Sequence, residues 1–205
     1  MRIAIVTLPL HTNYGGILQA YALRRVLIDQ GHECDLIDRE CKLVMPPSWK
    51  MPLIYMKRIV MNVFKAGNGP VVFREKRIMK ELPVVGAEVL RFTDKYISPR
   101  VVRGYRDIRM GEYDAFVAGS DQVWRPLYFG AIEDAFLGFT VRWNVKRVAY
   151  AASFGTDILE YSYEQLEACT PLLKKFDAVS VREQSAVQLC DEWFEREDAV
   201  HVLDP

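Results

Sequence analysis

Two short apolar runs begin the chain, Arg2-Ile3-Ala4-Ile5-Val6-Thr7-Leu8 and Cys34-Asp35-Leu36-Ile37-Asp38. Their β-branched and apolar residues are typical of buried strands. Between them, Asn13-Tyr14-Gly15-Gly16 predicts a tight turn, and residues 17–30 have the apolar spacing of a helix that Gly31 ends. The order strand, helix, strand predicts a parallel pair of strands joined by a right-handed crossover.

Strand and helix patterns alternate again in the second half of the chain. They predict strands at 113–119, 146–152, 177–182 and 199–203. Helical patterns cover 162–175, which a capping box at Ser162-Tyr163-Glu164-Gln165 opens, and 184–194. The second half therefore continues the parallel sheet that the first strands begin.

Between 40 and about 111 this alternation is interrupted. Six of the ten prolines fall in this segment, which predicts an insert with helices near 53–65 and 72–95. The expected fold is α/β: a single domain whose parallel sheet has helices on both faces and carries a helical insert at 40–111.

The composition is that of a packed and charge-balanced protein. Among 205 residues there are 27 basic and 27 acidic side chains, and half of the residues are hydrophobic. Disorder of the whole chain is thereby excluded, and a nucleic-acid partner, which requires a basic excess, is not expected.

The cysteines and the N-terminus indicate the compartment. Four scattered cysteines lack the spacing of a zinc site or a disulfide framework, so we expect reduced thiols and no metal. No apolar run is long enough to span a membrane, and the N-terminal run lacks a cleavage site. A cytoplasmic location is expected.

The balanced total charge conceals a basic and an acidic region. Residues 49–80 carry a net charge of +7, and residues 156–205 carry −8. The helical pattern at 51–65, just after Trp49, places four apolar residues on one face: Leu53, Met56, Val60 and Val63. Two interpretations stay open: peripheral membrane contact through 49–80, or a helix that packs on the domain and has a solvated basic face.

Four of the expected strands lead into polar or glycine-rich loops. These loops are His11–Gly16, Gly119–Trp124, Ser153–Thr156 and Arg182–Ser185. The carboxyl ends of parallel strands meet at one edge of a sheet, so we expect all four loops on one rim. Open α/β sheets bind their ligands at that edge.

The first loop allows a ligand site or a plain turn. Gly15 and Gly16 let the backbone approach an anion at a helix N-terminus, or they only permit a tight turn. Asp38 stands where a dinucleotide-binding fold has its ribose-reading acid, but the G-x-G-x-x-G pattern is missing, so nicotinamide chemistry is not expected. His11 alone is more typical of a loop residue than of a catalyst.

The later loops have similar alternatives. Ser120 and Asp121 suit a ligand site, and both are also favoured helix N-caps. Arg182, at the carboxyl end of a strand, can bind a carboxylate or phosphate through two parallel hydrogen bonds. Its structural alternative is a salt bridge with Glu183 or Asp157.

Together these loops resemble the polysaccharide pyruvyl transferase family. The similarity lies in four segments with the family's order and spacing: Thr7–Leu23, Tyr113–Trp124, Tyr150–Gly155 and Ser180–Glu183. The first contains Asn13-Tyr14-Gly15-Gly16-Ile17-Leu18-Gln19-Ala20, and the second contains Gly119-Ser120-Asp121-Gln122-Val123-Trp124. The terminal Val202-Leu203-Asp204-Pro205 is similar to the family's junction into its second half.

The resemblance implies two Rossmann-like domains facing each other across a cleft, as in GT-B glycosyltransferases. This chain would be the N-terminal domain, and the second domain is expected after Pro205. The implied activity transfers pyruvate from phosphoenolpyruvate to hydroxyls of a glycan or lipid-linked saccharide as a ketal. This is a step of surface polysaccharide biosynthesis, at the inner face of the membrane and without a cofactor.

The resemblance also implies roles for individual residues. Arg182 would clamp the donor, Asp121 would act as a base, and Trp124 would offer a face on which a sugar stacks. The other substrate-binding positions would be Asn13, Tyr14, Gly15, Gly16, Gln19, Ser120 and Ser153.

The sequence departs from the family pattern in two places. Gly15-Gly16 stands where many members have Gly-Asp, so an acidic role there does not carry over. The family's proposed catalytic histidine belongs to the second half, and His11, His32 and His201 do not match it. We therefore expect no turnover by this chain alone. Two further functions stay open: a nucleotide-sugar glycosyltransferase of GT-B architecture, and a non-catalytic domain that binds a glycan or a partner.

Overall fold

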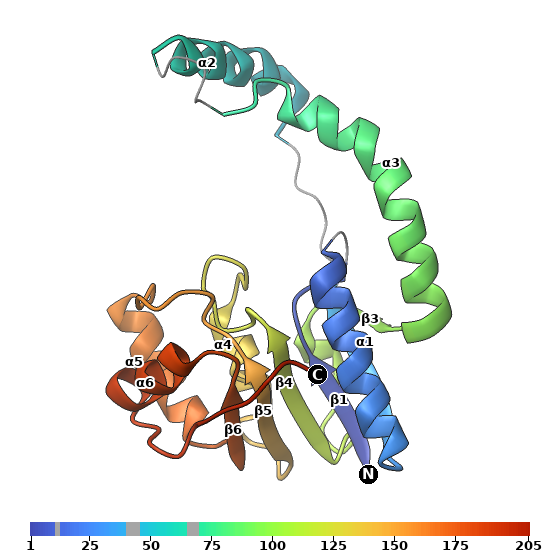
Figure 1. Cartoon of the computed structure of the whole chain (residues 1–205), viewed down its shortest axis with the longest axis vertical. Helices are drawn as coiled ribbons and strands as arrows, with labels where there is room; N and C mark the ends of the chain where they lie inside the picture. The colour runs from blue at the N-terminus through green and yellow to red at the C-terminus, as the bar shows by residue number, and fades with distance from the viewer. Residues whose placement is uncertain (11–12, 40–45, 65–69) are drawn as a thin grey trace. The chain divides into compact units, whose positions relative to one another are not determined.

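Seven parallel strands form one sheet in a computed structural model of the chain. The structure describes residues 1–10, 13–39, 46–64 and 70–205, and Figure 1 shows the arrangement of the elements. The strand order is β3-β2-β1-β4-β5-β6-β7. The strands are β1 Arg2–Val6, β2 Glu33–Arg39, β3 Arg100–Val102, β4 Ala115–Asp121, β5 Lys146–Ala152, β6 Ala178–Val181 and β7 Val200–His201. This order is that of a Rossmann-like fold, so the expected α/β class is confirmed.

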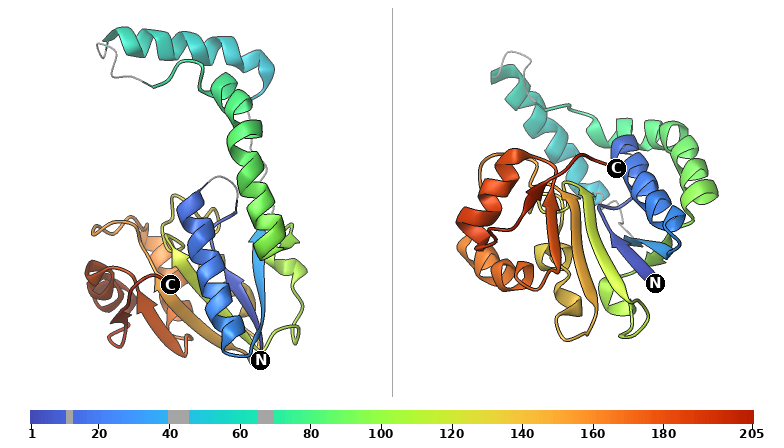
Figure 2. Two further views of the ribbon diagram at one scale, coloured as in Figure 1. Left: turned by 45° about the vertical axis from the view of Figure 1, so that its right-hand side comes forward. Right: turned by 60° about the horizontal axis from the view of Figure 1, so that its bottom comes forward.

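Helices cover both faces of this sheet. Helix α1 (Tyr14–Asp29) lies on one face, and α5 (Tyr163–Leu173) and α6 (Gln184–Phe194) lie on the other (Figure 2). The short helix α4 (Ile132–Ala135) packs beside α5. Every residue of β4 is buried, as expected for a central strand with both faces covered.

A hydrophobic core of buried side chains fills the space under α5 and α6. It includes the fully buried side chains Trp124, Phe136, Leu173 and Phe194. Trp124 and Phe136 stack with ring centroids 5.0 Å apart, and Phe136 stacks on Phe194 at 5.6 Å. These aromatic contacts fix the loop after β4 against the helical layer.

The insert is shorter than expected. Residues 41–91 form a compact unit of their own, and residues 1–40 and 92–205 form the other. The insert contains α2 (Met51–Phe64) and most of α3 (Arg74–Phe92), close to the two expected helices. Its expected end near 111 is wrong, because β3 pairs with β2 at Ile37–Arg39 and so belongs to the sheet. Three residues are too few to show an alternating pattern, so the sequence did not reveal this strand.

The expected turn at Gly15-Gly16 is also wrong. Both glycines lie inside the first turn of α1, which begins at Tyr14 after the N-cap Asn13. Glycine is normally disfavoured in the interior of a helix, and for this reason the sequence pattern predicted a turn at this position. Other elements agree closely: β5 and α6 have the expected bounds, 146–152 and 184–194.

Three of the four cysteines can be placed. Cys34, Cys169 and Cys190 are buried free thiols, and Cys41 lies outside the described residues. Burial raises the pKa of Cys34 to about 11 and that of Cys190 to about 12. These thiols therefore stay protonated at neutral pH and behave as small apolar side chains. Within the described part of the chain, no helix combines the length and apolar character needed to cross a bilayer.

The capping box at the start of α5 is confirmed. Ser162 Oγ accepts a hydrogen bond from the Gln165 N–H at 3.3 Å, and Gln165 Oε1 accepts one from the Ser162 N–H at 2.9 Å. These two bonds satisfy amide groups that would otherwise have no partner in the helix.

Replacing this cap tests its contribution to stability. We expect Ser162→Ala to lower the free energy of unfolding by about 1 kcal/mol, because an N-cap hydrogen bond is lost. Chemical denaturation would measure the change. Ser185→Ala, in the first turn of α6 but not at a cap, is the matched control. An equal or smaller loss for Ser162→Ala than for Ser185→Ala would contradict the expectation.

Candidate active site

The four predicted loops lie along one edge of the sheet, as expected. Strands β1, β4, β5 and β6 are parallel neighbours, so their carboxyl ends face the same way. The ends of the last three are level, since Asp121 pairs with Ala152 and Ala152 pairs with Val181. The loops that follow these strands therefore meet at one rim.

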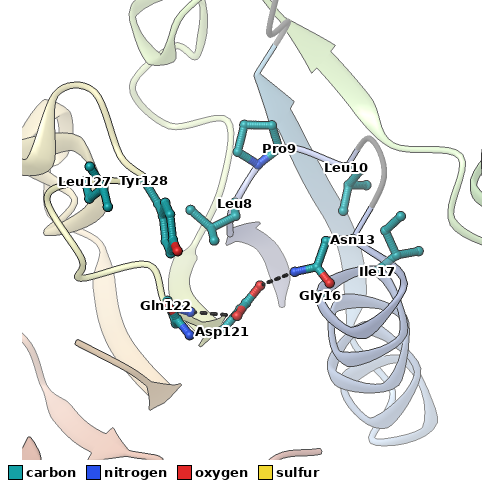
Figure 3. A pocket seen from close by; sticks show the side chains of 10 residues that line it. All are labelled: Leu8, Pro9, Leu10, Asn13, Gly16, Ile17, Asp121, Gln122, Leu127 and Tyr128. Carbon is teal, nitrogen blue, oxygen red and sulfur yellow. Dashed lines mark hydrogen bonds between the residues drawn. The ribbon is translucent and has the colours of Figure 1, made fainter. Parts of the chain in front are cut away.

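A cavity of about 430 Å³ opens where the strand order reverses, between the ends of β1 and β4 (Figure 3). Successive strands run outward in opposite directions from this point, so a crevice is left above the sheet. The lining residues come from the loop after β1, the start of α1 and the loop after β4. They are Leu8, Pro9, Leu10, Asn13, Gly16, Ile17, Asp121, Gln122, Leu127 and Tyr128.

Gly16 allows α1 to approach the end of β4. A Cβ atom on this residue would lie 2.5 Å from Asp121 Oδ2 and 3.2 Å from Asn13 Nδ2. At Gly15 the nearest atom, Asn13 Oδ1, would be 3.5 Å away, which is an ordinary contact. Of the two adjacent glycines, only Gly16 is therefore required by the packing of the site.

Asp121 is the carboxylate at the floor of the cavity. It is 7% exposed and has a positive φ of 80°, a region that aspartate tolerates better than most residues. Its Oδ1 accepts a hydrogen bond of 2.8 Å from the Gln122 N–H, and Asn13 Nδ2 donates a long one of 3.5 Å to Oδ2. The carboxylate is thus held in place at the start of α1, as Figure 3 shows.

Arg182 extends from the end of β6 into a group of three carboxylates. Its Nε donates to Glu183 Oε1 at 2.9 Å, so the expected salt bridge with Glu183 is present. Its Nη1 lies 3.5 Å from Asp204 Oδ2 and 3.9 Å from Asp121 Oδ1. Burial alone would lower the pKa of Arg182, but the hydrogen bond to Glu183 and the nearby carboxylates outweigh burial and raise it. The guanidinium therefore carries its charge at any physiological pH.

Ser153 connects the ends of β5 and β6. Its hydroxyl is fully buried and donates to Glu183 Oε1 at 2.8 Å. The same oxygen accepts hydrogen bonds from the Gly155 N–H at 2.9 Å and from Arg182 Nη2 at 3.3 Å. Ser153 was expected to bind substrate; in the structure its hydroxyl makes these three bonds within the protein and so links Arg182 to Glu183.

Three buried polar atoms at this rim have no hydrogen-bond partner among the described residues. They are Ser120 Oγ, Gln122 Oε1 and Glu183 Oε2. Leaving a buried acceptor or hydroxyl unpaired costs about 1–3 kcal/mol, so such groups gather where a ligand completes them. Gln122 lines the cavity directly. These unpaired atoms favour a ligand site at this edge of the sheet.

Trp124, which was expected to offer a stacking face to a sugar, does not line the cavity. Its indole is fully buried, stacks on Phe136, and donates from Nε1 to the Ala135 carbonyl at 3.3 Å. The aromatic ring that does face the cavity is Tyr128, which is 49% exposed. The sequence offered a weak signal for it, since Tyr128 follows Arg125-Pro126 in the loop after β4.

The other candidate residues near the first loop are either exposed or hydrogen-bonded within the protein. Tyr14 is half-exposed at the start of α1. Gln19 Nε2 donates to Asp204 Oδ2 at 2.6 Å, which joins α1 to the segment after β7. Asp38 accepts a hydrogen bond from the Leu10 N–H at 3.1 Å, so it supports the loop after β1.

Two helices begin at this rim. Neither Asn13 at the start of α1 nor Glu183 at the start of α6 caps its helix through a side-chain hydrogen bond. The first amide groups of a helix lack partners within it and carry a partial positive charge. These amide groups are therefore suited to anionic ligand groups.

The described histidines do not line this cavity. His11 lies outside the described residues, and neither His32 nor His201 lines the cavity. His201 is nevertheless close by, with Nε2 2.9 Å from the Arg182 carbonyl oxygen. The residues that the structure describes contain no group of three His, Cys, Asp or Glu side chains that could hold a metal ion.

A comparison with protein families finds one match. The model described as polysaccharide pyruvyl transferase matches residues 13–205, which is most of the chain. The matched region includes the start of α1 and the ends of β4, β5 and β6, and with them all of the residues that line the cavity except Leu8, Pro9 and Leu10. No curated protein matches the chain.

The two adjacent glycines provide a matched test of the packing at the cavity. We expect Gly16→Ala to lower the free energy of unfolding by about 1 kcal/mol, because the clash with Asp121 outweighs the better helix propensity of alanine. Gly15→Ala should raise it by about 0.5 kcal/mol, since the added methyl group meets only ordinary contacts. Thermal and urea denaturation of both variants would measure the difference, and equal effects would contradict this packing.

Proposed function

Because this chain belongs to the polysaccharide pyruvyl transferase family, we propose that it takes part in the transfer of pyruvate from phosphoenolpyruvate to saccharide hydroxyls. The product is a ketal that bridges two hydroxyls of one sugar and leaves a carboxylate on it. The proposed acceptor is a glycan or lipid-linked saccharide in surface polysaccharide biosynthesis, at the cytoplasmic face of the membrane. The observation that carries the proposal is the cavity at the strand reversal, with Asp121 in its floor and Arg182 beside it.

The donor requires cationic groups on two sides. Phosphoenolpyruvate has a carboxylate and a phosphate on adjacent atoms, and both need hydrogen-bond donors with positive charge. Helix α1 begins at the cavity wall, α6 begins beside Arg182, and Arg182 is permanently charged. These three features support an anion site on this rim.

Arg182 can accept an anion at one end of its guanidinium. The Nε contact to Glu183 is short, whereas the Nη1 contacts to Asp204 and Asp121 are 3.5 and 3.9 Å long. The long contacts contribute little, so a donor carboxylate or phosphate can replace them while Glu183 and Ser153 still hold the side chain. In this proposal Arg182 binds the donor, and Ser153 positions Arg182.

The reaction also needs acid and base groups. A proton must be added to the methylene carbon of the donor, one hydroxyl must attack the adjacent carbon, phosphate must leave, and a second hydroxyl must close the ketal. Asp121 is the carboxylate in the cavity and is proposed to accept a proton from an attacking hydroxyl. Gln122, which lines the cavity, is proposed to orient a sugar hydroxyl near it.

The acceptor is proposed to contact the apolar wall of the cavity. Tyr128 and Leu127 are both exposed there, and a sugar ring packs well against an aromatic face. Tyr128 takes the role that was first expected of Trp124. Arg125 stacks on Tyr128 with its guanidinium carbon 5.0 Å from the ring centroid, and pairs with Glu160, so the ring is held from behind.

Binding of phosphoenolpyruvate tests the anion site. We expect Arg182→Ala to weaken the affinity at least tenfold, since hydrogen bonds to a charged group contribute about 1.5–3 kcal/mol each. Arg182→Lys should lose part of the affinity, because lysine keeps the charge without the planar pair of donors. Isothermal titration calorimetry would measure each dissociation constant.

The control is Arg25→Ala, which removes an exposed arginine paired with Asp29 at the other end of α1. Its affinity for phosphoenolpyruvate should equal that of the unaltered chain. UDP-glucose is titrated in parallel. Binding of UDP-glucose without phosphoenolpyruvate would favour the glycosyltransferase alternative, and binding of neither would favour a non-catalytic domain.

Turnover is expected to need more than residues 1–205. The family resemblance assigns the proposed catalytic histidine to a second half, and we propose that a second Rossmann-like domain closes the cleft. Residues 1–205 should therefore bind phosphoenolpyruvate without releasing phosphate when a saccharide acceptor is present. A coupled phosphate assay would measure this, and steady release by residues 1–205 would contradict the proposal.

A further inference from the structure

Helix α2 has an unusual distribution of contacts within the unit formed by residues 41–91. Its polar side faces the following segment of the same unit. Arg58 Nη1 donates to the Val72 carbonyl at 3.2 Å, and Asn62 Nδ2 donates to the Pro70 carbonyl at 2.9 Å. On the same side, Tyr55 packs edge-on against Phe73 with ring centroids 5.0 Å apart.

The opposite side of α2 is apolar and exposed. Five residues at helical spacing lie on it with 47–75% of their surface exposed: Leu53, Met56, Ile59, Val60 and Val63. A helix in a globular protein normally turns this side to the core and its polar side to water. Among the described residues of its own unit, the polar side of α2 makes the contacts and the apolar side is exposed.

Basic and aromatic residues flank this apolar face. Trp49, just before α2, is 75% exposed, and Lys50 lies over its ring with Nζ 4.8 Å from the centroid. Lys57 is exposed beside the apolar face. The sequence has no acidic residue between Cys41 and Arg74, and residues 49–80 carry a net charge of +7.

We propose that the exposed face of α2, with Trp49, Lys50 and Lys57, binds the surface of a bilayer that contains anionic lipid. A helix of this length extends about 21 Å, too short to cross the hydrocarbon core, so it would lie in the plane of the interface. The apolar face enters the acyl boundary, Trp49 lies at the headgroup level, and the lysines reach the lipid phosphates.

Charge complementarity favours an anionic bilayer over a second copy of the chain as the binding partner of this face. Two copies of α2 pressed face to face would bring two basic segments together, and residues 42–73 of each copy contain no acidic residue to pair with the other's lysines and arginines. An anionic bilayer offers apolar depth and negative charge in the same geometry. This face of α2 contains none of the residues of the proposed active site, and its binding to vesicles can be measured without donor or acceptor.

Vesicle cosedimentation tests the proposal. The chain is mixed with vesicles of phosphatidylcholine alone, or of phosphatidylcholine with phosphatidylglycerol at a ratio of about seven to three. We expect binding to the anionic vesicles, little binding to the neutral ones, and weaker binding as salt rises. Quenching of Trp49 fluorescence by lipids brominated in the acyl chain should accompany binding and should be lost in Trp49→Phe.

Variants separate the apolar contribution from the charge. Val60→Asp should weaken partitioning into anionic vesicles at least tenfold, because it places a carboxylate in the apolar face. Lys57→Glu should weaken it more than fivefold, since one attraction is replaced by a repulsion. Ile158→Asp is the matched control: Ile158 is 70% exposed in a loop of the other unit and should bind as the unaltered chain does.

Circular dichroism and thermal denaturation would show that each variant is folded. Absence of binding to anionic vesicles would overturn the proposal, as would equal losses for Val60→Asp and Ile158→Asp. Self-association that Val60→Asp abolishes, in a chain that ignores vesicles, would assign the face to a second copy instead. None of these outcomes depends on phosphoenolpyruvate binding, so the proposed function is judged separately.

Discussion

The pairing of β1 with both β2 and β4 is the constraint on which the rest of the structure depends. Because β1 is central and every neighbouring pair is parallel, the chain runs outward in one direction through β2 and β3 and in the other through β4 to β7. The helical layers then lie on opposite faces, and a crevice remains where the two directions part. Gly16 lets α1 approach the end of β4 at this point, so the helix start and Asp121 form one cavity.

The positive charge of Arg182 at the rim is balanced by nearby carboxylates. Arg182 lies among three carboxylates, and burial would disfavour its charge if they were absent. Breaking a buried ion pair by removing one partner is costly, whereas contacts as long as those of Arg182 Nη1 with Asp204 and Asp121 contribute little. The short contact to Glu183 and the hydroxyl of Ser153 fix the guanidinium, and the longer contacts leave room for exchange.

Much of the fold could be predicted because its signals are local. Buried parallel strands are continuous apolar runs, and the capping box at Ser162 and the helix at 184–194 follow from side chains within a few residues. The errors come from contacts that are distant in sequence. Strand β3 is three residues long and is defined by its pairing with β2. Position 16 of helix α1 needs a glycine because a Cβ there would collide with Asp121, a residue more than a hundred positions later. No periodicity within a window records either contact.

The candidate site shows the same division, and so does α2. Sequence order placed the four loops on one rim, and Asp121, Asn13 and Gly16 do line the cavity. The sequence could not distinguish Trp124 from Tyr128, because both are aromatic residues after β4, and only packing shows that Trp124 fills the core while Tyr128 faces the cavity. For α2, periodicity identified the apolar face but left its environment open. The contacts of Arg58 and Asn62 with residues 70–72 show that the polar side of α2 binds its own unit, whose described residues leave the apolar side exposed.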